Sequence, residues 1–364
     1  MNEHFAAIPN SEYWVGLIQT MPGFWIVAFS PIAGWLADRY GRRTILLVAM
    51  VVYAVTGVAP FFLDDIVAIL VTRSLVGMCE SVVLTVTTTM LCDYFKSPVR
   101  ERWLAAQTGL ASLSALFIIW LGGVLGERFG WQGPFLAYLY SLVLALGVYW
   151  FTWEPEREAA NPEPAAAGHA VYETLPWARM IGIIAVTLFG SVAFYSTITQ
   201  NANALVALGV TNPARIGEYA TIASLGVPIG TVAFWVLGRL PVAMLLALDF
   251  LLIGIGFWYM SAATTPLAYA LAANVQQIGC GLVLPTLLVW ATRGLAYRIR
   301  GRGVGLWQGA FGIGLFISAA VLTWLGQRLG GLLPAFAVMA QVCVVLAALA
   351  LGAQLFARLR PVRA

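Results

Sequence analysis

Eleven apolar stretches, each long enough to cross a lipid bilayer, occupy most of this chain of 364 residues. A helix needs about 20 apolar residues to span the hydrocarbon core, and 61% of the residues are hydrophobic whereas only 10% are charged. These stretches leave no segment for a separate soluble domain. The sequence therefore predicts an all-α membrane protein with eleven transmembrane helices, at residues 13–36, 44–63, 66–91, 103–126, 134–153, 177–208, 214–238, 241–261, 266–291, 303–326 and 331–357.

The basic residues between these stretches predict the orientation in the membrane. Cytoplasmic loops carry an excess of Lys and Arg, and alternate loops of this chain hold sixteen basic residues on one side against three on the other, Arg128, Arg215 and Arg328. The C-terminus is therefore expected to be cytoplasmic and Met1 to lie on the outer side. Residues 1–12 have neither a basic region nor an apolar core, so they are not a signal peptide.

One long polar segment divides the chain. Residues 154–176 contain four prolines and five glutamates and cannot form a core, so they are predicted to be a cytoplasmic linker. We expect an N-terminal bundle of five helices at 1–153 and a C-terminal bundle of six at 177–364. A further helix ahead of Met1 would restore a six-plus-six pattern, so the first helix is expected to be missing.

Several kinds of chemistry are disfavoured by the sequence. The four cysteines lie in or beside apolar stretches without a C-x-x-C pair, and the two histidines lie in loops, so no metal site, iron–sulfur cluster or disulfide framework is expected. No phosphate-binding loop of the G-x-x-x-x-G-K-[ST] type occurs. We therefore expect no cofactor, no nucleic-acid partner and no enzyme activity. A membrane-embedded enzyme, the remote alternative, would need His, Asp or Cys clustered at one membrane face.

The strongest local motif is GWLADRYGRR in the first short loop. Gly34 permits close helix approach, Asp38 can bind a helix N-terminus or an arginine, Gly41 permits the turn, and Arg42 with Arg43 forms a basic hinge.

With this motif the chain resembles the major facilitator superfamily, whose signature between the second and third helices has this form. The resemblance implies a two-bundle helical fold, a monomer, and a conformational latch in which Arg42 meets Asp93 of the sequence LCDYF and Asp38 takes part. The equivalent loop of the second half, VLGRLPV, lacks the acid and the second basic residue, so a weaker latch is expected there.

A second motif, ILVTRSLVGMCE, places Arg73 and Gly77 as in the fourth helix of the same family. Glu80 follows Arg73 by seven residues, which puts both side chains on one helix face with a rise of roughly 10 Å. Charges inside a membrane are costly and usually face a cavity or a partner. Arg73 and Glu80 are therefore candidates for proton coupling. In the competing interpretation, backbone carbonyls hold Arg73 and a neighbouring polar group holds Glu80.

Other polar residues inside the predicted spans outline a candidate substrate cavity. Each must find a hydrogen-bonding partner, either a neighbouring helix or a solute. They are Gln107, Tyr195, Thr199, Gln200, Asn203, Asn274, Gln276, Gln277, Trp307 and Gln308. Asp249 is a further acid, for which we expect a structural pairing.

These features predict a secondary active transporter that moves a small solute by alternating access, coupled to protons. Within the family the chain looks most like the bacterial drug and sugar efflux branch, in the bacterial inner membrane, although SALFIIWLGG lacks the glycine–proline pair of the proton antiporters. A proton-coupled uptake symporter for an organic acid or sugar would have the same fold and motifs.

Overall fold

The computed structural model describes residues 1, 4–5, 7–95, 99–154, 172–293, 295 and 297–359. It confirms the all-α expectation: apart from one isolated bridge between Tyr172 and Leu295, the regular structure in these residues is helical. The chain divides into two compact units, Met1–Ala166 and Ala167–Ala364. Most of the expected linker, residues 155–171, lies outside the described residues.

Ten helical segments of the described chain are long and apolar enough to cross a membrane, so the expected count of eleven is not matched. The difference lies in the expected spans 103–126 and 134–153, because α4, η2 and α5 follow one another with no residue between them, so that Leu113–Phe151 forms one segment. Gly130, whose φ is +71°, lies inside this segment. Pro134 comes within 3.9 Å of a Cβ built on Gly122, so the chain folds back on itself beyond Gly130.

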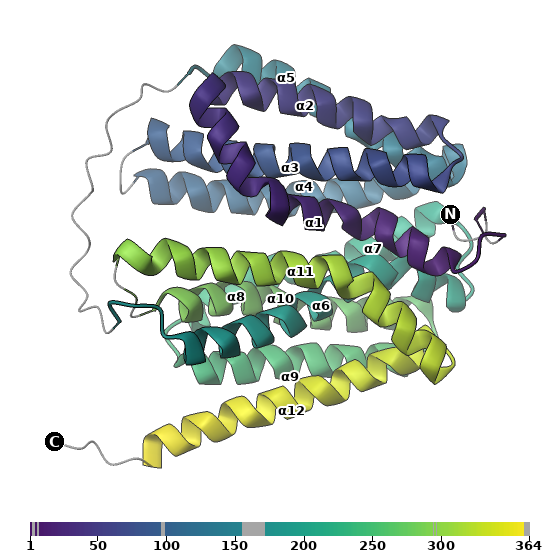
Figure 1. Cartoon of the computed structure of the whole chain (residues 1–364). Helices are drawn as coiled ribbons and strands as arrows, with labels where there is room; N and C mark the ends of the chain where they lie inside the picture. The colour runs from purple at the N-terminus through teal and green to yellow at the C-terminus, as the bar shows by residue number, and fades with distance from the viewer. Residues whose placement is uncertain are drawn as a thin grey trace. The chain divides into compact units, whose positions relative to one another are not determined.

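In the N-terminal unit, α1 and α2 are joined at Gly41, which has a φ of +93°, a backbone conformation that glycine adopts readily. Helix α1 crosses α3 closely, because a Cβ on Gly77 would lie 2.6 Å from the Pro22 Cα. Helix α2 packs against α3, η2 and α5. The elements are α1 (Ser11–Tyr40), α2 (Arg42–Val58), η1 (Ala59–Phe62), α3 (Ile66–Tyr94), α4 (Val99–Phe129), η2 (Gly130–Leu139) and α5 (Tyr140–Phe151) (Figure 1).

In the C-terminal unit, helix α10 packs against α6, α7, α8 and α9, and α12 packs along α9. The expected span 214–238 is divided at Leu225 into two short helices, α7 and α8. The elements are α6 (Trp177–Ala207), α7 (Pro213–Ser224), α8 (Gly226–Leu237), α9 (Val242–Ser261), α10 (Pro266–Thr292), α11 (Tyr297–Leu329) and α12 (Leu332–Leu359) (Figure 1).

Glycines let α10 approach its neighbours backbone to backbone. A Cβ on Gly281 would lie 3.1 Å from the Gly230 Cα, and one on Gly230 would overlap the Ile278 carbonyl oxygen of α10. On another side, a Cβ on Gly279 would lie 2.8 Å from the Asp249 carbonyl oxygen of α9. Small residues of this kind allow the close helix contacts that stabilise membrane bundles.

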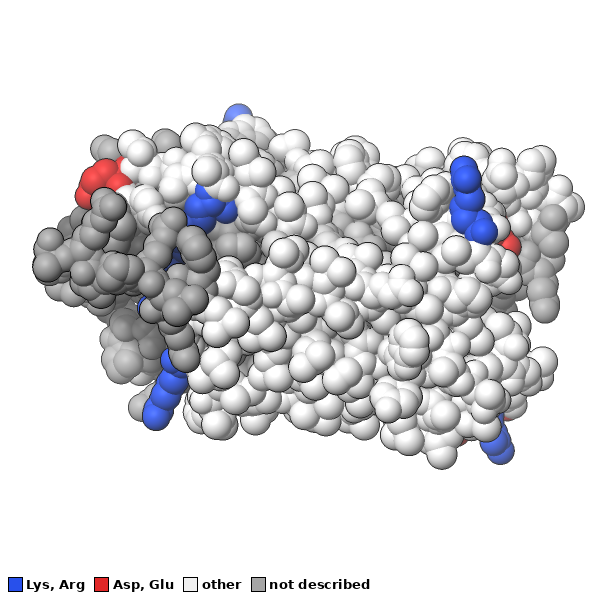
Figure 2. Space-filling model, turned by 90° about the horizontal axis from the view of Figure 1, so that it is seen from below, with Lys and Arg blue, Asp and Glu red and all other residues white. Residues whose placement is uncertain are grey.

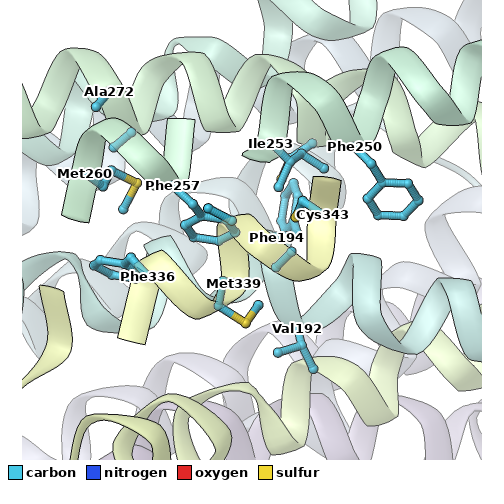
Figure 3. Close-up of a cluster of buried hydrophobic side chains, with 14 of the residues drawn as sticks. Val192, Phe194, Phe250, Ile253, Phe257, Met260, Ala272, Phe336, Met339 and Cys343 are labelled. Atoms are coloured by element: carbon cyan, nitrogen blue, oxygen red, sulfur yellow. The ribbon is translucent and has the colours of Figure 1, made fainter. Parts of the chain in front are cut away.

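The core of the C-terminal unit is apolar and aromatic. The Phe257 and Phe336 rings stack at 5.6 Å between centroids, and Met260, Met339 and Cys343 lie around them (Figure 3). On the face seen in Figure 2, the charged side chains lie towards the two ends, and the surface between them is uncharged. This distribution suits a chain whose middle lies in hydrocarbon.

Candidate functional site

Arg73 is a buried cation of the N-terminal unit, with 3% of its surface exposed. Its Nη2 donates to the carbonyl oxygens of Thr56 (3.3 Å) and Gly57 (3.0 Å), in the last turn of α2, and its Nη1 donates to the Tyr138 hydroxyl (3.0 Å). The guanidinium carbon also lies 4.9 Å from the centroid of the Tyr138 ring and 5.0 Å from that of Phe135. A cation favours the negative C-terminal end of a helix, so Arg73 stabilises the end of α2.

Gly57 makes room for this arrangement. A Cβ at Gly57 would overlap the Tyr138 ring, so only a residue without a side chain lets η2 bring the Tyr138 hydroxyl to Arg73. Tyr138 lies in an apolar stretch, and nothing in its sequence context indicates that it binds an arginine 65 residues away.

Glu80 lies two turns after Arg73 on α3 and is partly buried. Among the described residues no ion pair within 4.0 Å joins these two side chains. Glu80 does interact electrostatically with Arg73, Tyr53 and Tyr138, and the two tyrosine rings lie 5.1 Å apart. Arg73, Glu80, Tyr53 and Tyr138 thus form one polar cluster between α2, α3 and η2, which we call the arginine cluster.

The second polar centre lies at the end of α1, the start of α2 and the end of α3. The Arg42 guanidinium forms an ion pair with Asp93 and lies 3.8 Å from the Asp38 carboxylate. The Asp38 side chain is 73% exposed, whereas that of Asp93 is 30% exposed. The sequence resemblance implied this set of residues, and we call it the latch.

Glu154 joins the latch from the end of α5, although sequence reasoning assigned it to the linker. Its Oε1 accepts from the Arg42 backbone N–H (2.5 Å) and its Oε2 from the Arg43 N–H (2.9 Å). These are the first two residues of α2, so the carboxylate caps that helix. A Cβ on Gly41 would lie 3.2 Å from the Glu154 carboxyl group, so the glycine leaves space for this cap.

Two further contacts hold the end of α5 against the latch. The Arg43 guanidinium donates to the Tyr149 carbonyl oxygen (2.5 Å) and lies over the Tyr149 ring at 5.2 Å. The Tyr94 hydroxyl donates to the Trp153 carbonyl oxygen and accepts from the Trp153 N–H at 3.3 Å. Burial raises the pKa of the Tyr94 hydroxyl above its usual value, so this group keeps its proton at neutral pH and remains a donor.

Most of the polar residues expected in a substrate cavity form hydrogen bonds within the protein, either to a neighbouring helix (Gln276, Gln277, Asn274 and Gln107) or within α6 itself (Thr199, Gln200 and Asn203). Two glutamines of α10 bind α6: Gln276 donates to the Ala193 carbonyl oxygen (2.8 Å) and accepts from the Thr197 hydroxyl (2.9 Å), and Gln277 donates to the Phe194 carbonyl oxygen (3.2 Å). Asn274 of α10 binds α7, because it donates to the Ile222 carbonyl oxygen (2.7 Å). Thr199 donates to the Tyr195 carbonyl oxygen (2.9 Å), Asn203 to Gln200 (2.8 Å) and, in the N-terminal unit, Gln107 to Thr87 (3.4 Å).

Tyr195 and Trp307 belong to an aromatic group instead. Their rings lie 5.5 Å and 6.0 Å from that of Phe311, and both side chains are partly exposed. Gln308 is exposed. Within the described residues, no group of three or more His, Cys, Asp or Glu side chains could hold a metal ion.

A family model described as "Major Facilitator Superfamily" matches residues 1–295. The chain belongs to this superfamily. The niacin transporter NiaP of Acinetobacter baylyi is 27% identical over 146 residues, and the hexuronate transporter of Bacillus subtilis is 25% identical over 157. These matches cover 40% and 42% of this chain but only 32% and 36% of the relatives, so the matched segments span about a third of those proteins.

Solved structures share the fold over nearly the whole chain. The nucleoside transporter NupG has a TM-score of 0.75 at 13% identity, covering 94% of this chain and 90% of its own. A bacterial homologue of the lysosomal transporter Spinster, inward-facing and occupied, has a TM-score of 0.74 at 15% identity, covering 96% and 90%. The superfamily membership and the apolar helices identify an integral membrane protein of a transporter family, not an enzyme.

Proposed function

We propose that this protein is a proton-coupled secondary transporter that expels a small solute by alternating access between two helical bundles, 1–153 and 177–364, joined by the linker 154–176. The observation that carries this proposal is the arginine cluster. It places an acid, Glu80, inside an apolar unit beside a fixed cation to which it is not paired.

This geometry supports a role for Glu80 as the proton carrier. Arg73 stays charged at every accessible pH, and its Nη groups are occupied by the α2 carbonyls and Tyr138. Arg73 therefore sets a constant positive field, and Glu80 is the group in the cluster that can gain and lose a proton. A change of water access or of the distance to Arg73 would change the proton affinity of Glu80.

The latch supports the alternating-access part of the proposal. It ties the start of α2 to the ends of α3 and α5 by charge, through Arg42, Asp93 and Glu154. We propose that Gly34, Asp38, Gly41, Arg42, Arg43 and Asp93 stabilise one of the two transport conformations. Tyr195, Trp307 and Gln308 remain our candidates for solute contact, since they are at least partly exposed.

A direct test uses the full chain in liposomes with an imposed pH gradient. Proton flux is followed with a trapped pH-sensitive dye while niacin, a hexuronate and a lipophilic cationic dye are offered in turn. We expect Glu80→Gln to abolish the dependence of solute movement on the gradient, and Glu218→Gln, a change at an exposed acid of the other unit, to leave it intact. Undiminished gradient-driven transport by Glu80→Gln would remove Glu80 from the mechanism.

A proton-coupled uptake symporter for an organic acid is the second candidate. The relatives named as niacin and hexuronate transporters favour it, because both names denote carboxylic acids. The same liposomes separate the two candidates through the direction of flux. Accumulation of an acid on the side to which protons flow supports uptake, whereas movement of solute against the proton flow supports efflux.

A further inference from the structure

Asp249 is an acid that the arginine cluster and the latch do not use. It lies in the middle of α9 and is 0% exposed, and no donor among the residues that the structure describes is well aligned with either carboxyl oxygen, Thr286 being the hydrogen-bonding group beside it. An ionised carboxylate buried without a partner is very unfavourable. Either a cation compensates it or the group is neutral.

The helices around Asp249 offer no cation. Helix α9 packs against α10 and α12, and the sequences of α9 and α10 contain no Lys, Arg or His. In α12 the single basic residue is Arg358, in its last turn. Within the part of the chain that the structure describes, the titratable groups that face this region are Cys280 of α10, which interacts with Asp249, and Cys343 of α12, beside Cys280. Phe250 and Ile253, which follow Asp249 on α9, belong to the buried apolar core (Figure 3).

Thr286 of α10 is the hydroxyl group beside Asp249. A hydroxyl has one proton to donate, and Thr286 donates it to the Leu282 carbonyl oxygen at 2.8 Å. Its remaining capacity is that of an acceptor. A hydrogen bond between Asp249 and Thr286 therefore requires the proton to come from Asp249.

We propose that Asp249 is a proton-binding site of the C-terminal unit, in which the neutral carboxylic acid donates to Thr286 Oγ1 and links α9 to α10. The ligand is a single proton. Beside it the α9 and α10 backbones meet closely, since a Cβ on Gly279 would lie 2.8 Å from the Asp249 carbonyl oxygen. Because the Asp249 side chain is 0% exposed, we expect the proton to stay bound while α9 and α10 remain packed. This inference does not depend on proton coupling by Glu80.

Infrared spectroscopy of the full chain in lipid, with isotope-labelled aspartate, tests the proposal on the unchanged protein. The other aspartates, Asp38, Asp64, Asp65 and Asp93, lie at or beside helix ends. We expect one labelled protonated-acid carbonyl band at neutral pH, and no loss of this band at mildly alkaline pH. If the labelled aspartates give only carboxylate bands at neutral pH, the proposal is wrong.

Variants assign the band to Asp249 and to its acceptor. Asp249→Asn should remove the band, whereas Glu80→Gln should leave it, because Glu80 does not carry the label. Thr286→Val removes the acceptor and should move the band to higher frequency, and Thr286→Ser should restore the original position. A band that persists in Asp249→Asn, or that does not move in Thr286→Val, would contradict the assignment. Should Asp249→Asn fail to fold, the labelled unchanged protein still decides the question.

Discussion

Glu154 and Arg73 bind opposite ends of helix α2, and their side chains carry opposite charges. The Glu154 carboxylate accepts from the first two backbone N–H groups of α2, and the Arg73 guanidinium donates to carbonyl oxygens in its last turn. Both charges have the sign that the helix dipole favours. Helix α2 is thus held electrostatically from α5 at one end and from α3 at the other.

Removing the cap at the start of α2 should lower stability. We expect Glu154→Ala to cost about 1 kcal/mol, because the Arg42 and Arg43 N–H groups lose their acceptor. Glu154→Gln keeps one acceptor oxygen and should cost less. Thermal unfolding in detergent measures both variants, with the exposed Glu173→Gln as the matched control. Equal melting temperatures for Glu154→Ala and the control would show that the cap is not needed.

At the other end of α2, Arg73 and Tyr138 should contribute differently to the stability of the folded protein. Tyr138→Phe removes one hydrogen bond but keeps the ring, so we expect a loss of about 1 kcal/mol. Arg73→Lys should cost more, because an ammonium group cannot reach Tyr138 and two carbonyls with the geometry of a guanidinium. Chemical denaturation followed by tryptophan fluorescence compares them, with the exposed Tyr140→Phe as control. A Lys variant as stable as the unchanged protein would contradict this arrangement.

Within the latch, Asp93 should matter more than Asp38. Asp93 forms the closer ion pair with Arg42 and is less exposed. We expect Asp93→Asn to change several-fold the rate at which an impermeant thiol reagent labels a cysteine introduced at Gln107, and Asp38→Asn to change it less. Raising the ionic strength should reduce the difference, since salt screens exposed charges. The reverse order of the two variants would overturn this ranking.

The glycines of α10 provide a steric prediction. Gly281→Ala should destabilise the C-terminal unit by about 1–3 kcal/mol, because the new methyl group would lie 3.1 Å from the Gly230 Cα and overlap the Val227 carbonyl oxygen. Gly182→Ala is the control, since nothing lies within 4 Å of its Cβ position. Unfolding of both variants in detergent is the measurement, and equal stability would show that α8 and α10 separate easily.

The sequence predicted the parts that depend on local patterns. Hydropathy indicated the apolar helices. The count differed because the 3₁₀ helix η2 joins α4 directly to α5, so the two spans expected there form one segment. The GWLADRYGRR motif led to the contact of Arg42 with Asp93.

Local sequence patterns did not predict the residues that bind Arg73 and Arg42 from distant parts of the chain. Tyr138 and Glu154 reach their partners across 65 and 112 residues, and both lie in stretches whose composition indicates only membrane or linker. Arg73 donates to the backbone carbonyl oxygens of Thr56 and Gly57, as the competing interpretation of its role expected. The polar residues of α6 and α10 could have faced a solute or each other, and only the packing of the two helices distinguishes these outcomes.

Helix α10 contacts α8 and α9 at glycines, where no side chain separates the backbones. The residues on the two sides of each contact therefore cannot change independently. A larger residue at Gly281 fits only if the facing segment of α8, at Gly230 and Val227, withdraws or is rebuilt, and the same holds for Gly279 and α9. Viable natural variation at these positions is therefore expected to come in matched pairs across helices. Directed evolution of the C-terminal unit should consequently randomise both sides of each contact together.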